Sequence, residues 1–140
     1  MTKLNPFVRI DGGKCREAMN FYKDALGGEL YFMTVEESPM ANDMGPDKQN
    51  LIMHSSLSNN GWVLIASDMM RDKLVVGDNA GISLDFDNEA ELRSTFDKLA
   101  QGGDVFMAPE ASFWGAIFGM VTDKYGVEWM LNFQKEPMKK

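Results

Sequence analysis

His54 is the side chain in this sequence best suited to proton chemistry, because it is the single histidine and imidazole changes charge near neutral pH. It lies in a strand-like run in which alternation places Ile52 and Ser56 on the same face. Two interpretations stay open. His54 is either a structural residue with its hydrogen bonds satisfied, or it faces a ligand and exchanges a hydrogen bond with it.

Arg9 and Glu128 are the charged residues for which the sequence suggests a role in binding or catalysis. Arg9 follows Phe7 by two residues, so strand alternation aims both side chains the same way, and its planar guanidinium would bind an anionic group. An ion pair with Glu128 or Asp85 explains Arg9 equally well. Glu128 shares a strand face with Met130 and would be that partner or a general base.

Familiar catalytic patterns are missing from the sequence. It has no Ser-His-Asp order, no phosphate-binding loop and no cysteine pair. An acid–base pair of His54 and Glu128 is the catalytic candidate, and a divalent metal held by these two residues and Asp85 is a second possibility. Cys15 lies near a helix start, but without a partner histidine or a second cysteine we interpret it as structural.

Large apolar side chains near these polar groups favour ligand binding. The sequence has twelve methionines, which either fill irregular gaps in the core or make adaptable binding walls. Trp114 would line a pocket or a dimer seam, whereas Trp129 lies on the strand face opposite Met130 and is assigned to the core beneath a helix. The candidate wall consists of strand and loop residues: Phe7, Met130, Met40, Met44, Met69 and Met70.

Two similar stretches of sequence would position these residues. Residues 14–30, KCREAMNFYKDALGGEL, predict an amphipathic helix that ends at a Gly-Gly pair and runs into a strand. Residues 91–105, ELRSTFDKLAQGGDV, repeat that design. The same offset separates Phe21 from Phe96 and one Gly-Gly pair from the other, which indicates a duplicated unit.

The chain as a whole predicts the order β-α-β-β-β, twice. The expected strands span 4–10, 29–35, 51–58 and 61–67 in the first copy, and 80–87, 105–108, 113–122 and 127–133 in the second. The expected helices span 14–26 and a segment from about 89; residues 36–50 form a long loop, and Asn59-Asn60-Gly61 a hairpin turn. We therefore predict an α+β fold in which paired βαβββ modules form one curved mixed sheet, a half-barrel cup with helices on its outer face.

Length and composition restrict the class of protein. A chain of 140 residues with 44% hydrophobic residues predicts one folded domain, 1–140, with module one at about 4–67, a linker at about 68–79 and module two at about 80–134. The net charge of −7 argues against nucleic acid or an anionic membrane as partner. One cysteine, no signal peptide and no apolar run long enough to span a bilayer predict a cytoplasmic protein.

Three segments together resemble one known family. They are NPFVRIDGGKCREAMNFYKDALGGEL, then LIMHSSL with GWVLIASD, then ASFWGAIFGMVTDKYGVEWMLNF. Over residues 5–133 the chain resembles the vicinal oxygen chelate superfamily, and within it the PhnB-like branch of the glyoxalase and bleomycin-resistance type. The resemblance implies paired βαβββ modules forming a cup, usually in homodimers, with the ligand in the cup. It covers lyases, dioxygenases, epimerases and drug-binding proteins.

Many members of that superfamily bind a divalent metal through His, Gln or Glu at four strand positions. In this sequence the four positions correspond to Phe7, Leu64 or Ile65, Gly81 or Ser83, and Met130. None of these residues is a normal ligand of such a metal. The resemblance therefore implies a member without the usual metal site.

The sequence predicts a PhnB-like protein that binds a small molecule in an apolar cup, as a homodimer and without a metal or other cofactor. The expected ligand-binding residues are Phe7, Arg9, His54, Trp114 and Met130. The alternative is an enzyme of the same superfamily, a lyase, isomerase or dioxygenase-like protein, with a relocated metal site or an acid–base pair of His54 and Glu128. A dimeric scaffold without a ligand is a third reading, and the sequence does not name the ligand.

Overall fold

The chain forms two compact units, Met1–Val75 and Val76–Lys140, and the computed structural model describes residues 1–68 and 73–134. The first unit contains β1 (Phe7–Ile10), α1 (Cys15–Leu26), β2 (Glu29–Thr34), β3 (Ile52–Asn59) and β4 (Trp62–Asp68), with two 3-10 turns, η1 (Ala41–Asp43) and η2 (Pro46–Lys48). The second contains β5 (Ile82–Phe86), α2 (Glu89–Ala100), β6 (Asp104–Ala111), β7 (Ala116–Thr122) and β8 (Glu128–Gln134).

Both units have the same topology. The strand order is β1-β4-β3-β2 in one sheet, here called sheet A, and β5-β8-β7-β6 in the other, sheet B. The pairs β1–β4 and β5–β8 are parallel, and the other strand pairs are antiparallel. The predicted α+β fold of paired βαβββ modules is confirmed, with the strands divided between two four-stranded sheets.

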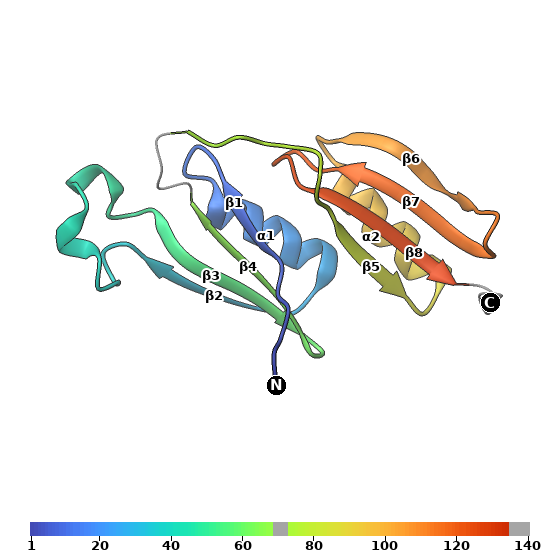
Figure 1. Cartoon of the computed structure of the whole chain (residues 1–140), viewed down its shortest axis with the longest axis horizontal. Helices are drawn as coiled ribbons and strands as arrows, with labels where there is room; N and C mark the ends of the chain where they lie inside the picture. The colour runs from blue at the N-terminus through green and yellow to red at the C-terminus, as the bar shows by residue number, and fades with distance from the viewer. Residues whose placement is uncertain (69–72, 135–140) are drawn as a thin grey trace. The chain divides into compact units, whose positions relative to one another are not determined.

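Each helix packs along one face of the sheet in its own unit (Figure 1). The buried side of α1 consists of Cys15, Ala18, Met19, Tyr22 and Ala25. The buried side of α2 consists of Leu92, Thr95, Phe96 and Leu99. Strand alternation sends every second side chain of a sheet toward the helix of its own unit and leaves the others on the opposite face, here called the open face.

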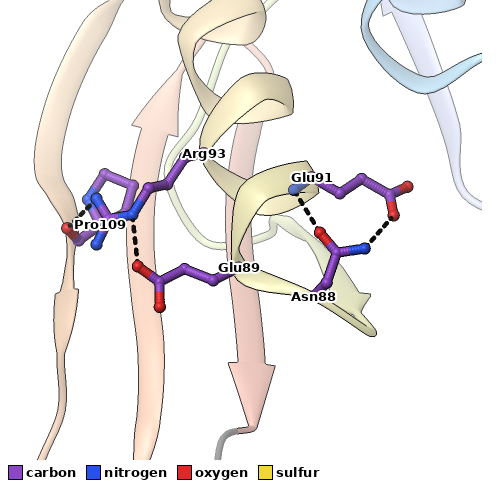
Figure 2. Close-up of polar contacts among 5 residues, drawn as sticks. All are labelled: Asn88, Glu89, Glu91, Arg93 and Pro109. Atoms are coloured by element: carbon purple, nitrogen blue, oxygen red, sulfur yellow. Dashed lines mark hydrogen bonds and ion pairs between the residues drawn. The ribbon is translucent and has the colours of Figure 1, made fainter.

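The start of α2 is defined by a side-chain cap and an ion pair (Figure 2). Asn88 Oδ1 accepts a hydrogen bond of 2.7 Å from the Glu91 backbone N–H, the usual role of an N-cap residue. Arg93 forms an ion pair with Glu89 at 2.9 Å and donates to the Pro109 carbonyl at 3.2 Å. Arg93 therefore connects α2 to β6.

The largest differences from the expected strand bounds in the second unit concern β6 and β7. The predicted strand 105–108 was expected to end before Pro109, but β6 runs through this residue to Ala111. Proline is tolerated there because β6 is an edge strand with register shifts between Val105 and Met107 and between Met107 and Glu110.

The other difference concerns β7, which begins at Ala116 instead of residue 113. The segment before it is a turn, because the Ser112 backbone N–H donates to the Ala116 carbonyl at 2.8 Å and Gly115 has φ 82°. The predicted hairpin turn between β3 and β4 is confirmed, with positive φ at Asn60 and Gly61.

Candidate functional site

The open face of sheet A carries two of the expected ligand-binding residues on β1. Phe7 and Arg9 share this face, as alternation predicts, and the Arg9 guanidinium carbon lies 5.0 Å from the centroid of the Phe7 ring. Their register partners on β4 are Ile65 and Ser67. Phe7 and Arg9 therefore form a cation–π pair that presents both a charged and an apolar group.

His54 lies on the same open face. Its neighbour Ser55 points toward α1, where its hydroxyl lies 3.6 Å from the Cys15 sulfur, so alternation turns the His54 side chain the other way. The imidazole is half-buried and tilted against the Tyr31 ring, with 6.3 Å between ring centroids. His54 is paired with Met33 across the β2–β3 ladder. Its position suits contact with a ligand on this face.

The open face of sheet B carries an aromatic pair with a polar connection. The Trp114 ring meets the Phe118 ring edge to face, with 5.3 Å between centroids. Its indole Nε1 donates to Asn132 Oδ1 at 3.4 Å, and Asn132 Nδ2 donates to Asp85 Oδ1 at 3.5 Å. The Gln134 side-chain Nε2 donates a hydrogen bond of 2.9 Å to the Trp114 carbonyl oxygen. These contacts fix the large Trp114 side chain over the sheet.

A row of methionines crosses the same face. Met130 on β8 is the register partner of Met120 on β7, which is in turn the partner of Met107 on β6. Ser83 on β5 continues the row on the other side of Met130. Thioether side chains are polarisable and adapt their shape, so this row is an adjustable apolar surface.

The residues at the four family metal positions meet in pairs, one pair within each unit. Phe7 is the register partner of Ile65 in the first. In the second, a Cβ at Gly81 would lie 2.9 Å from Met130 Cε, and Ser83 is the register partner of Met130. The two positions within each unit are therefore adjacent, but a ring, an aliphatic chain, a thioether and a serine hydroxyl do not form the ligand set of a divalent metal.

Within residues 1–68 and 73–134, no three His, Cys, Asp or Glu side chains are grouped to hold a metal ion. His54 lies in the first unit, whereas Glu128 and Asp85 lie in the second. The acid–base pair, the relocated metal site and the ion pair of Arg9 with either carboxylate therefore stay predictions. The half-buried Glu128 borders a hollow in sheet B, beside its register partner Thr122.

Cys15 and Trp129 both lie in the core, as expected. Burial raises the pKa of the Cys15 thiol to about 11, against the smaller lowering effect of its contact with Ser55. Such a thiol is a poor nucleophile near neutral pH, which agrees with a structural role. Trp129 is 1% exposed and lies on the helix side of sheet B.

The loop methionines lie in the segment between β2 and β3 or outside the described residues. Gln49 Nε2 donates to the carbonyls of Ala41 and Met44 at 3.0 Å each, so one side chain ties the two 3-10 turns together. Met40 on this loop is exposed and Met44 is half-buried. Met69 and Met70, the other expected wall residues, lie outside the described residues.

Sequence reasoning placed Asn132 on the face of Met130 but missed Phe118 and Met120 as parts of the open face of sheet B. Period-two alternation along β7 would have joined Phe118 to Met120. In the helices that the structure describes, none is both long and apolar enough to cross a membrane.

Comparison with known families agrees with this architecture. The model of the Glyoxalase/Bleomycin resistance protein/Dioxygenase superfamily matches residues 6–131. The chain belongs to this superfamily. The match begins just before β1 and ends within β8.

Individual known proteins match this chain over almost its whole length. Protein YjdN of Escherichia coli (strain K12) is 30% identical over 95% of this chain and 96% of its own length. The crystal structure of protein PA1353 from Pseudomonas aeruginosa is similar with a TM-score of 0.86 and 35% identity, covering 97% of this chain and all of that one. The PhnB protein of Bacillus cereus is similar with a TM-score of 0.73 and 26% identity over 94% of this chain and 99% of that one. PhnB-like proteins are thus among its structural neighbours.

Proposed function

We propose that this chain is a PhnB-like small-molecule-binding protein that works without a metal. The observation that carries the proposal is the open face of sheet B, where the Trp114 and Phe118 rings and the methionine row lie next to the polar pair Asn132 and Asp85. Ligand sites are typically apolar surfaces with a few oriented polar groups. The open face of sheet A adds a second surface of the same kind, with Arg9 on Phe7 and His54 beside Tyr31.

The absence of a metal from this function is supported by the residues at the family positions. Phe7, Ile65 and Met130 place apolar groups where carboxylate or imidazole ligands would be needed, and Met130 Cε occupies the space beside Gly81. A binding function needs no Lewis acid, so these side chains contribute contact area for an apolar ligand.

We also propose that the protein is cytoplasmic and forms a homodimer. The single, buried cysteine suits a reducing compartment, and the superfamily usually forms homodimers.

Binding of anilinonaphthalene sulfonate, a fluorescent aromatic anion, tests the proposal. We expect saturable binding to the native protein that is unchanged by EDTA, and at least a tenfold loss of affinity in Trp114→Leu. Trp62→Leu is the matched control, because Trp62 lies at the β3–β4 hairpin of the first unit and shares the strand face of Leu64, which is buried on the helix side.

Bound dye then becomes the readout for a metabolite library, in which displacement identifies candidate ligands. Equal dye affinity in Trp114→Leu and the wild type would remove the open face of sheet B from the site. Loss of binding with EDTA and recovery with a divalent metal would contradict metal independence. Light scattering on the purified protein measures whether two chains associate.

A further inference from the structure

A hollow of about 310 Å³ lies within the second unit, beside the place where β7 turns into β8. Its described lining consists of Asp78, Phe106, Met120, Val121, Thr122 and Glu128. The volume is at the lower end of the range for small-molecule sites, enough for a compact ligand with one ring. The Trp114 contacts described above involve none of these lining residues.

One wall of the hollow is aromatic and polarisable. The register of β6 passes from the pair Val105–Val121 to the pair Met107–Met120, so Phe106 is an extra residue in the edge strand. Such a bulge redirects side chains, and Phe106 lines the hollow together with Met120 while remaining 77% exposed. An accessible ring face attracts cations through its quadrupole.

The charged side chains of the hollow are acidic. Asp78 and Glu128 both line it, and none of its described lining residues is a lysine, arginine or histidine. Gly81 leaves room for the Glu128 side chain, whose Oε1 lies 3.5 Å from the point that a Cβ at this glycine would occupy. The two carboxylates give the hollow a negative charge, which favours a positively charged ligand.

We propose that this hollow binds an organic cation, an ammonium group carried on an apolar body. The ammonium group lies between Asp78 and Glu128, the Thr122 hydroxyl adds a hydrogen-bond acceptor, and the body packs on Phe106 and Met120. A hard divalent ion is a poorer match, because it needs six or more oxygen ligands and gains nothing from a ring and a thioether. The inference rests on the proposed small-molecule-binding function and adds a second position in the same unit, with a preference for a positively charged group.

Titration with phenylethylammonium, followed by two-dimensional amide NMR, tests the charge requirement. Phenylethanol, which has nearly the same shape and no charge, is the matched ligand. We expect phenylethylammonium to shift the amides of residues 120–122 and 128 and to bind at least tenfold more tightly than phenylethanol. In Glu128→Gln that preference should fall to about threefold or less, whereas Asp97→Asn, an equal charge change on α2, should leave it intact.

Each other outcome overturns the inference. Equal binding of both ligands would mean an apolar hollow, no binding of either would mean no site, and tighter binding of Mg²⁺ or Ca²⁺ at the same amides would mean a metal site. If Glu128→Gln does not fold, Asp78→Asn in the segment before β5 provides the same charge change. Dye binding that depends on Trp114 is measured separately, so loss of the cation preference leaves the proposed function standing.

Discussion

The indole Nε1 of Trp129 donates a hydrogen bond of 2.8 Å to Asp123 Oδ2, between two side chains that are 1% and 3% exposed. The other carboxylate oxygen of Asp123 accepts the backbone N–H groups of Tyr125 and Val127 at 2.8 and 3.1 Å. One buried carboxylate thus holds the turn between β7 and β8, where Gly126 has φ 89°, and joins it to the core. The Asp-x-x-Gly-Val-x-Trp pattern of the sequence therefore has a structural role, which is to stabilise the turn between β7 and β8.

Asp123→Ala should lower the free energy of unfolding by about 3 kcal/mol, because it removes the acceptor of one buried and two part-buried hydrogen-bond donors. Trp129→Phe removes one of those donors and should cost about 2 kcal/mol, part of it from lost packing. Urea unfolding of both variants and of the double variant gives the coupling energy between the two side chains, expected at about 1 kcal/mol or more. Additive costs would show that the hydrogen bond contributes nothing.

Asp68 in the first unit should be as sensitive as Asp123. Its Oδ1 accepts the backbone N–H of Cys15 at 2.9 Å and its Oδ2 that of Ile52 at 2.7 Å, and the carboxylate is 2% exposed. The residue at the N-cap position of α1, Lys14, makes no side-chain cap, so β4 supplies the cap from a distance. Asp68→Asn turns an amide NH₂ toward one of these donors and should cost about 2 kcal/mol.

Hydrogen exchange provides the second measurement for Asp68→Asn. We expect faster exchange at the amide of Cys15 or Ile52, whichever loses its acceptor, with little change in β5–β8. Unchanged exchange at both amides, together with unchanged unfolding in urea, would contradict a capping role.

The repeated Gly-Gly pairs perform one steric function in both modules. A Cβ on Gly28 would lie 2.5 Å from the Ser58 carbonyl oxygen, and one on Gly103 would come closer still to the Thr122 carbonyl oxygen. Since backbone cannot move aside, Gly28→Ala and Gly103→Ala should each cost about 2 kcal/mol or more. Gly77→Ala, with an ordinary contact of 3.5 Å, is the control and should stay within about 0.5 kcal/mol of the wild type. Similar stabilities for all three variants would refute the close-approach explanation.

Local patterns were sufficient to predict most of the fold. Helical periodicity and the two glycine stops predicted α1 and α2, and strand alternation placed Phe7 and Arg9 on one face and Trp129 in the core. These features depend on neighbours close in sequence. The edge position that allows Pro109 inside β6 depends on which strand pairs with which, and single-residue patterns do not contain that information.

The candidate site was less accessible to sequence reasoning for a related physical reason. Phe7 and Met130 were proposed because the family pattern marked their positions, whereas the contacts of Trp114 with Phe118 and Asn132 depend on the turn at residues 112–115. The partners of buried carboxylates are equally hidden. Asp68 binds a backbone N–H that is 53 residues away, and any residue type could supply that group.

The Cys15 thiol links stability to alkaline pH. Its pKa rises from 9.0 to about 11 on folding, chiefly because burial disfavours the thiolate. The raised pKa of Cys15 therefore leaves the free energy of unfolding unaffected below about pH 9. Between pH 9 and 11 the free energy of unfolding falls, because the unfolded chain releases a proton that the native state retains. The loss should reach about 2–3 kcal/mol in urea unfolding at pH 11 relative to pH 8. Other groups titrate in that range, so Cys15→Ala is the reference. Its stability should fall less over the same interval, and parallel curves for the two proteins would show that the thiol has no part in the pH dependence.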